Sequence, residues 1–223
     1  MIRKDAKILE KDFLTEDVVK IVFEKPKEFL FEPGQFINIK IEKEGSYRMR
    51  AYSILSTPYE ETLDICLKII PNGWASESFR EAKKDDEYTL IGPFGHFKLG
   101  EKEKEHVFIS TGTGVVPFIS MIKSYVKKGV KMTLIAGYKK EENIIYHDEL
   151  KMLERDNDNF IYKPTITRED WDGLKGRVQK HLPDNLENKM FYICGLKEFV
   201  IETKELLLEK GVAEKDIKIE RYN

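Results

Sequence analysis

The glycine-rich segment at residues 110–117 is the part of the sequence whose residue types and spacing best suit a chemical role. It reads Ser-Thr-Gly-Thr-Gly-Val-Val-Pro and leads from an apolar run into a helix predicted at 116–128. Two glycines let the backbone approach a pyrophosphate closely, and a helix N-terminus offers free N–H donors. An ordinary strand-to-helix turn would look the same. The residues predicted to line a dinucleotide site here are Thr111, Gly112, Thr113, Gly114 and Pro117.

A second candidate binding segment, Arg50-Ala51-Tyr52-Ser53, lies on a predicted strand in the first half of the chain. Side chains alternate along a strand, so Arg50 and Tyr52 point to one side and Ala51 and Ser53 to the other. A guanidinium can pair with a phosphate, a phenol ring can pack on an isoalloxazine, and a hydroxyl can hydrogen-bond a flavin ring nitrogen. The alternative is a core role for Tyr52 and a surface ion pair for Arg50.

A further phosphate cradle is predicted at the start of the one helix expected before residue 100, at 75–82. The sequence Asn-Gly-Trp-Ala-Ser at 72–76 would open this helix with free backbone N–H groups. The residues assigned to this part of the cofactor site are Lys68, Gly73, Trp74, Ala75 and Ser76.

The first half of the chain is predicted to be an antiparallel barrel, because short β-branched and aromatic runs alternate with turn residues. The expected strands are 18–23, 35–41, 51–55, 63–70 and 88–91. Residues 100–105, Gly-Glu-Lys-Glu-Lys-Glu, contain no core-forming side chain. They are interpreted as the linker between a domain at 1–100 and a domain at 101–223.

The second half alternates strands with helices, a pattern typical of a parallel sheet covered by helices. The expected strands are 106–110, 132–137, 160–167, 190–194 and 217–222, and the expected helices are 116–128, 146–154, 175–182 and 197–210. Ligands of such sheets bind at the carboxyl ends of the strands. The residues expected to share that edge are 111–114, Gly137, Thr167, Arg168, Cys194 and Gly195.

Composition argues against several other functions. The 223 residues carry a net charge of −2, and no apolar run approaches the roughly 20 residues that cross a bilayer, so neither nucleic-acid binding nor a membrane span is expected. The N-terminus lacks a signal-peptide core, which favours a cytoplasmic location. The two cysteines, Cys66 and Cys194, cannot build an iron–sulfur cluster, and the four histidines show no metal-ligand spacing. No metal site is predicted.

In their order along the chain, these motifs resemble those of the ferredoxin-NADP reductases. Residues 50–53 resemble the family's Arg-x-Tyr-Ser flavin motif, 73–76 its flavin phosphate-binding turn, and 112–117 its Gly-Thr-Gly-x-x-Pro nucleotide motif. Cys194-Gly195-Leu196 resembles the segment whose cysteine approaches the nicotinamide. The fold that this resemblance implies is β + α/β, with an antiparallel flavin-binding β-barrel followed by a Rossmann-like five-stranded parallel α/β domain.

The carboxyl end, Glu220-Arg221-Tyr222, resembles the Glu-x-Tyr ending of the plant-type reductases, in which the tyrosine stacks on the flavin. This chain differs by the additional Asn223. A final edge strand in which Tyr222 merely packs is the alternative. The catalytic residues that the resemblance implies are Ser53, Cys194, Glu220 and Tyr222.

The coenzyme choice is read from Thr167-Arg168-Glu169 and from Lys175 and Arg177, which resemble the basic segment of NADPH-specific members. Cations there could neutralise a 2′-phosphate, whereas an NADH site would present a carboxylate to the ribose. Arg177 stands where plant-type members have tyrosine, so NAD(H) remains the alternative coenzyme. The turn at 73–76 favours FAD over FMN.

The activity implied is electron transfer between NADPH and a ferredoxin or flavodoxin through bound FAD, because the chain has no cluster of its own. One alternative is an NAD(P)H:flavin reductase that uses free flavin as a substrate. Another is an electron-transfer subunit of a larger complex. The physiological acceptor, the direction of electron flow and the oligomeric state are not encoded in any motif.

Overall fold

The computed structural model describes residues 1–101 and 103–222. Its chain forms two compact units. Unit 1 comprises Met1–Lys98 with Ile119–Met121, and unit 2 comprises Leu99–Phe118 with Ile122–Asn223.

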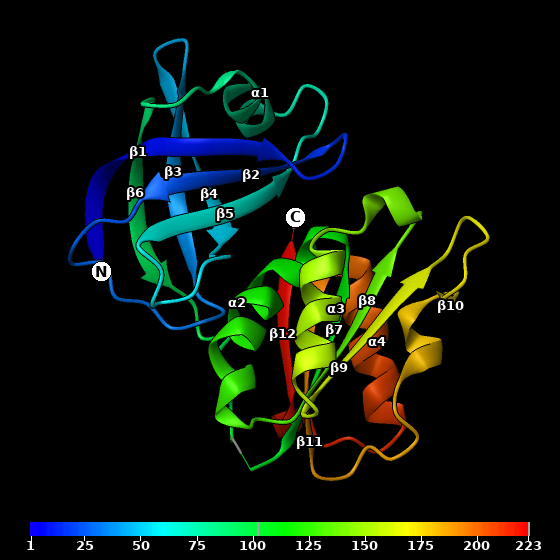
Figure 1. The fold of residues 1–223 in the computed structure, drawn as a ribbon. Helices are drawn as coiled ribbons and strands as arrows, with labels where there is room; N and C mark the ends of the chain where they lie inside the picture. The colour runs from blue at the N-terminus through cyan, green and yellow to red at the C-terminus, as the bar shows by residue number, and fades with distance from the viewer. Residues whose placement is uncertain (102, 223) are drawn as a thin grey trace. The chain divides into compact units, whose positions relative to one another are not determined.

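Unit 1 is a curled, six-stranded antiparallel sheet in the order β4-β3-β6-β1-β2-β5 (Figure 1). A bridge between Ile54 and Ile65 joins its two edges. The strands are β1 (Ile2–Phe13), β2 (Val18–Glu24), β3 (Phe36–Lys43), β4 (Ser46–Ser53), β5 (Thr62–Lys68) and β6 (Glu87–Phe94). The predicted antiparallel architecture is confirmed, and the single predicted helix is α1 (Trp74–Glu81).

Two strands of unit 1 differ from the sequence-based prediction. β1 was not predicted, because only Ala6 and Ile8 of its twelve residues are buried and the rest give no alternating apolar pattern. β4 begins five residues earlier than expected, since its first half is polar and exposed. Glu44 and Gly45, with φ of 52° and 74°, form the tight connection from β3 to β4. Positive φ at both turn positions suits the twist of a β-hairpin.

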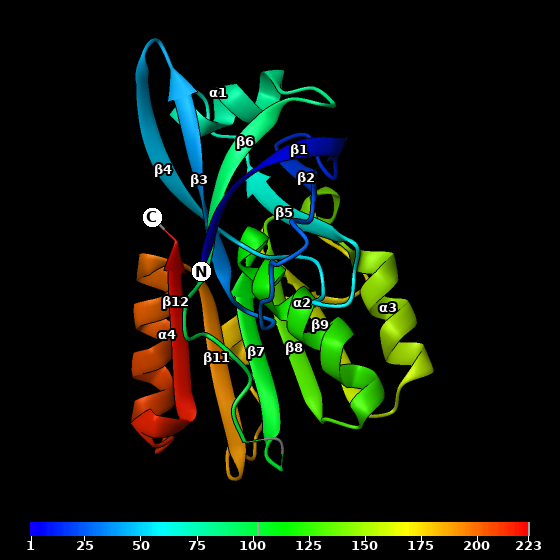
Figure 2. The same ribbon diagram turned by 90° about the vertical axis from the view of Figure 1, so that its left-hand side faces the viewer.

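Unit 2 is a parallel sheet in the order β10-β9-β8-β7-β11-β12. Its strands are β7 (Glu105–Thr111), β8 (Met132–Tyr138), β9 (Phe160–Ile166), β10 (Leu174–Lys175), β11 (Lys189–Leu196) and β12 (Ile217–Tyr222). Its α-helices are α2 (Val116–Tyr125), α3 (His147–Asp156) and α4 (Lys197–Glu209). Figures 1 and 2 show α2 and α3 on one face of the sheet and α4 on the other. Helices on both faces bury the sheet, and all seven residues of β8 are buried.

The expectation of five parallel strands is wrong, because the sheet has six. The additional strand, β10, pairs its two residues with Thr165 and Ile166 of β9. The helix predicted at 175–182 is also wrong. Gly176 has φ of 99°, only a short 3-10 turn follows at Val178–His181, and Pro183 comes soon after, so an α-helix does not form.

The predicted linker at 100–105 is bound to unit 2 in its described residues. The Gly100 N–H donates to the Tyr192 hydroxyl at 2.7 Å, and the Lys104 ammonium lies 2.7 Å from a carboxylate oxygen of Asp216. Glu105 already belongs to β7. This stretch contains no apolar side chain, yet backbone and charged groups hold it in place.

Candidate functional site

The predicted nucleotide residues of unit 2 meet at the carboxyl ends of β7 and β11. These strands pair in parallel with Ser110 opposite Cys194. A Cβ added at Gly114 would overlap the Cys194 carbonyl oxygen and lie 3.1 Å from the Gly195 Cα. A Cβ added at Gly195 would lie 2.8 Å from the Thr111 hydroxyl oxygen. Two segments 80 residues apart therefore approach backbone to backbone, and only glycine fits between them.

The turn that follows β7 has the form of a phosphate cradle. Gly112 has φ of 53°, and a Cβ there would meet nothing within 4 Å, so its backbone borders open space. A 3-10 turn, Gly112–Val115, leads directly into α2, and no side chain of the described residues caps either element. Pro117 occupies the first turn of α2, where no N–H partner is needed. These residues fit a dinucleotide phosphate, which the uncapped N–H groups could bind.

Cys194 lies next to both predicted catalytic residues of the last strand. β11 and β12 pair with Cys194 opposite Glu220 and Leu196 opposite Tyr222. Cys194 is fully buried, and burial raises the pKa of its thiol well above 9.0; Glu220 adds to this shift, and a hydrogen bond with Tyr222 opposes it. The thiol is therefore neutral at physiological pH. Asn223, which the sequence adds after Tyr222, lies outside the described residues.

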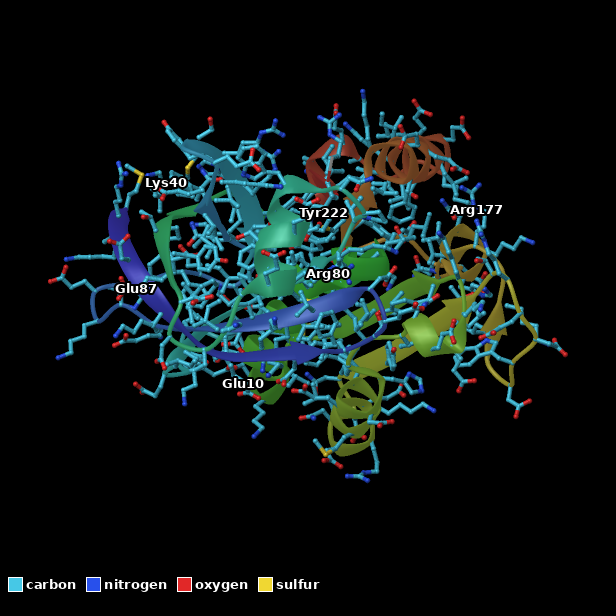
Figure 3. All side chains as sticks on the ribbon, turned by 90° about the horizontal axis from the view of Figure 1, so that it is seen from above. Glu10, Lys40, Arg80, Glu87, Arg177 and Tyr222 are labelled. Atoms are coloured by element: carbon cyan, nitrogen blue, oxygen red, sulfur yellow. The ribbon has the colours of Figure 1, made fainter. Side chains whose placement is uncertain are left out.

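The residues predicted to select NADPH lie beyond the ends of β9 and β10. Arg177 forms a two-pronged ion pair with Glu202 of α4 at 2.7 and 2.8 Å, and Lys175 pairs with Asp170. Within the described ranges, the Arg168 side chain has no ion-pair partner. Figure 3 shows Arg177 well apart from Tyr222, at the other side of unit 2. Of these three cations, Arg168 is thus the one most available to a phosphate.

The flavin motif of unit 1 lies on β4 at the edge of the sheet. Arg50 and Ala51 are exposed, Tyr52 is half-buried and Ser53 is buried. The Tyr52 ring packs edge-on against Phe79 of α1 with 5.7 Å between ring centres. Burial raises the pKa of the Tyr52 phenol, and the Arg50 charge partly opposes this. Tyr52 therefore contacts the core on one side while Arg50 remains open to an anion.

The second flavin segment of unit 1 surrounds the start of α1. Gly73 is the N-cap, with no side chain of the described residues capping it, and the helix N–H groups that follow are open to a phosphate. The Ser76 hydroxyl accepts the Ile70 N–H at 2.9 Å, which leaves its own proton free to donate. The Trp74 indole donates to the Ile41 carbonyl at 3.2 Å. Lys68 instead pairs with Asp17 at 2.6 Å.

Two residues near these segments were not assigned to a site from the sequence. The Arg48 guanidinium lies 4.5 Å from the centre of the Trp74 ring. Arg48 lies two residues before Arg50 and therefore on the same face of the strand, which could have identified it from the sequence as a further candidate. Ser110, just before the glycine turn, is fully buried, and its hydroxyl has no hydrogen-bond partner among the described residues. A buried unpaired hydroxyl at a strand end is a candidate ligand contact.

Comparison with known proteins accounts for both units. Residues 5–99 match the oxidoreductase FAD-binding domain family, and residues 108–205 match the oxidoreductase NAD-binding domain family. The chain is 32% identical to ferredoxin–NADP reductase B of Sorangium cellulosum, over 98% of this chain and 97% of that protein. This chain belongs to the ferredoxin-NADP reductase family. It is a flavoprotein oxidoreductase with an FAD-binding unit and a nicotinamide-nucleotide-binding unit.

Other proteins similar to this chain are also reductases or reductase subunits. A ferredoxin-NADP reductase from Neisseria gonorrhoeae, solved with bound FAD and NADP, superposes with a TM-score of 0.90 at 26% identity and 98% coverage of both chains. A glycine betaine monooxygenase reductase subunit of Pseudomonas aeruginosa is 30% identical over 84% of this chain but only 55% of its own length. The chain thus spans about half the length of that subunit. Among the described residues, no helix of this reductase is long and apolar enough to cross a membrane.

Proposed function

We propose that this reductase transfers electrons between NADPH and a ferredoxin or flavodoxin by way of bound FAD. The observation that carries this proposal is the convergence of the turn at 111–114 with Cys194 and Gly195, beside the last strand that bears Glu220 and Tyr222. That edge combines backbone N–H groups that can bind a phosphate with a neutral thiol, a carboxylate and an aromatic ring. Together these groups could orient a nicotinamide. FAD, when bound, accepts a hydride from the nicotinamide and passes electrons on one at a time.

The residues of unit 2 would bind and orient the coenzyme. The N–H groups at 112–115 would bind the pyrophosphate, and the Arg168 guanidinium would pair with the 2′-phosphate. The neutral Cys194 thiol would border the nicotinamide without competing as a nucleophile, since a thiolate is required for attack. Glu220, which lies opposite Cys194 on the neighbouring strand, would hold the accompanying proton. Tyr222 would cover the flavin ring until the nicotinamide takes its place.

The residues of unit 1 would hold the flavin. Arg50 would pair with a flavin phosphate, the N–H groups at the start of α1 would bind the same group, and the buried Ser53 hydroxyl would hydrogen-bond the ring. Tyr52, whose ring is fixed against Phe79, would present its other face to the isoalloxazine. Trp74 and Ser76 would complete the turn. Lys68, paired with Asp17, would contribute only if that ion pair opened.

The proposal is tested by mixing the purified holoprotein with NADPH, a ferredoxin or a flavodoxin, and excess cytochrome c. Carrier-dependent reduction of cytochrome c, which stops when the carrier is omitted, is expected. Reduction that depends only on added free flavin would instead identify an NAD(P)H:flavin reductase. Activity that appears only with further subunits would identify a component of a larger complex.

A further inference from the structure

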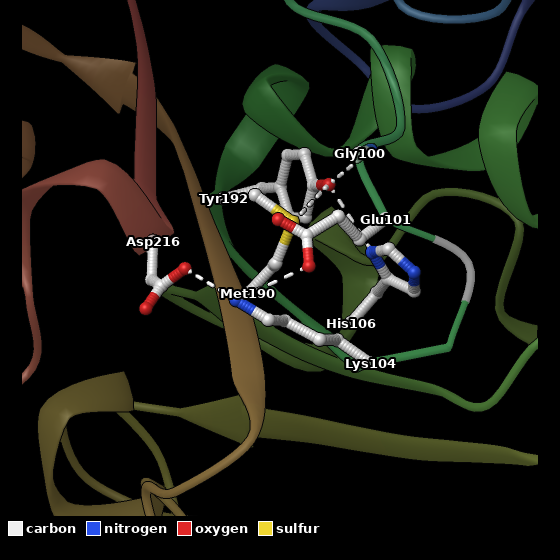
Figure 4. A network of polar contacts seen from close by, with 7 residues as sticks. All are labelled: Gly100, Glu101, Lys104, His106, Met190, Tyr192 and Asp216. Atoms are coloured by element: carbon white, nitrogen blue, oxygen red, sulfur yellow. Dashed lines mark hydrogen bonds and ion pairs between the residues drawn. The ribbon is translucent and has the colours of Figure 1, made fainter.

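Tyr192 connects two parts of unit 2 through one buried hydroxyl. It lies on β11 and is fully buried. Its oxygen accepts the Gly100 N–H at 2.7 Å and lies 3.1 Å from the His106 Nδ1 (Figure 4). It also lies 3.8 Å from the Met190 sulfur. Burial raises the pKa of the Tyr192 phenol to about 12, so the hydroxyl remains protonated and keeps its capacity to accept and to donate.

The segment that this hydroxyl binds is the point at which the chain enters unit 2. Unit 2 begins at Leu99, one residue before Gly100. A Cβ added at Gly100 would overlap the Met190 side chain and lie 3.3 Å from the Tyr192 oxygen, so the backbone approaches β11 as closely as glycine allows. Lys104 adds a second attachment through Asp216 at 2.7 Å and Glu101 at 3.6 Å. The first passage of the chain from unit 1 to unit 2 is therefore bound to unit 2 directly after it enters that unit.

The strand that holds this connection also carries the nicotinamide edge. Tyr192 precedes Cys194 by two residues on β11, a central strand paired with β7 and β12. Its ring packs against Phe108 and His106, with ring centres 5.2 and 5.7 Å apart. Any shift of the connecting segment relative to β11 is thus resisted by one hydroxyl, while the ring is held separately by packing.

We infer that Tyr192 is a positioning residue for the redox reaction, which acts by fixing residues 99–101 to the strand that carries Cys194. The expected slowing of flavin reduction rests on the proposed function. In Tyr192→Phe the ring packing is retained, but the half-buried Gly100 N–H loses its acceptor, so the segment loses this attachment to β11 while the Lys104–Asp216 pair remains. Coenzyme binding depends on the turn at 111–114 and stays intact, whereas alignment for hydride transfer is lost. Small misplacements of reacting groups are costly, so we expect about a tenfold fall in rate.

The test is anaerobic stopped-flow bleaching of the holoprotein flavin by NADPH, or by NADH if only NADH bleaches it. For Tyr192→Phe we expect the limiting rate to fall about tenfold while the half-saturating coenzyme concentration stays within about twofold. Tyr162→Phe is the matched control, because its hydroxyl also meets a histidine, His147, at 3.3 Å in unit 2. That variant should change neither quantity. An unchanged rate in Tyr192→Phe, or an equal fall in both variants, would overturn the inference.

Amide hydrogen exchange of the wild-type protein tests the anchor without a variant and without turnover. The Gly100 amide should exchange as slowly as the amides of β7. Rapid exchange at Gly100 would refute the anchor even if the protein folds and reacts normally. Protection at Gly100 in a protein that neither coenzyme bleaches would instead count against the proposed function alone.

Discussion

The two units present their predicted cofactor residues in different ways. In unit 2, the turn at 111–114 and the segment at Cys194 and Gly195 touch backbone to backbone, because parallel pairing brings both strand ends to one edge. In unit 1, the residues at 50–53 and 73–76 lie on different elements, and side chains link them: Tyr52 to Phe79, and Trp74 to the β3 carbonyl of Ile41. Topology brings the first group of predicted residues together, whereas side-chain packing holds the second group.

The largest expected effect tests this difference with glycine substitutions. Gly114→Ala forces a Cβ into the Cys194 backbone, which cannot yield, and should lower the free energy of unfolding by about 3 kcal/mol. Gly73→Ala places a Cβ 2.9 Å from the Ser76 hydroxyl and 3.0 Å from the Ile70 carbonyl oxygen, which is less severe than the overlap at Gly114, and should cost only about 1 kcal/mol. Gly112→Ala, in open space but at positive φ, should cost about 1–2 kcal/mol. Urea unfolding measures all three, and equal losses at Gly114 and Gly73 would contradict the comparison.

A pH effect should appear in unit 2 because it buries a histidine. Burial and the Lys218 charge lower the pKa of His106 from 6.5 to about 4, against opposing contributions from Glu101 and Glu105. As the pH falls through 6.5 the unfolded chain takes up a proton and the folded protein does not, so stability decreases between 6.5 and 4. The expected loss between pH 7 and pH 5 is about 2 kcal/mol.

Urea unfolding at pH 7 and pH 5 measures this loss, with His106→Gln as the comparison. Tryptophan fluorescence separates the units, since Trp74 lies in unit 1 and Trp171 in unit 2. A Trp74→Phe background therefore reports unit 2. If the wild type and His106→Gln lose stability equally on acidification, His106 is not the group responsible.

Flavin retention should depend in part on Arg50, an exposed cation of unit 1. Arg50→Ala removes the charge proposed to pair with the flavin phosphate and should weaken FAD binding roughly 10- to 100-fold, the usual range for a charged hydrogen bond. Arg155→Ala is the control, because Arg155 is an exposed arginine of unit 2 paired with its neighbour Asp156. Equilibrium dialysis against FAD gives both affinities. Unchanged affinity in Arg50→Ala would remove Arg50 from the flavin site.

The smallest expected effects concern the choice of coenzyme. Arg168→Ala should lower the preference for NADPH over NADH about tenfold, as expected for loss of a phosphate-pairing charge. Arg177→Ala should lower it only about twofold, because Glu202 already neutralises Arg177. The ratio of kcat/KM for the two coenzymes measures both changes. A larger effect at Arg177 would show that its ion pair opens to bind the coenzyme.

The features that could be predicted from the sequence are mainly those that strand topology determines, and the features that could not are mainly those that depend on side-chain packing. Five of the six strands of unit 2, its three α-helices and the meeting of 111–114 with Cys194 follow from parallel topology, which sequence periodicity indicates well, whereas the helix predicted at 175–182 does not form. β10 was missed because two residues carry no periodic signal, and β1 because its exposed, charged side chains hide the alternation. The ion pair of Arg177 with Glu202 depends on how two separate elements place their side chains. The sequence does not reveal this, so Arg177 was predicted to be free for the coenzyme.

An anaerobic titration of the purified, dialysed protein with NADPH and, separately, NADH would test the proposed reductase activity. We expect a flavin absorption spectrum that survives dialysis and is bleached preferentially by NADPH. Preferential bleaching by NADH would contradict the role of Arg168 but leave the reductase activity intact. A colourless protein that oxidises NAD(P)H only when free flavin is added would contradict the proposed transfer through bound FAD.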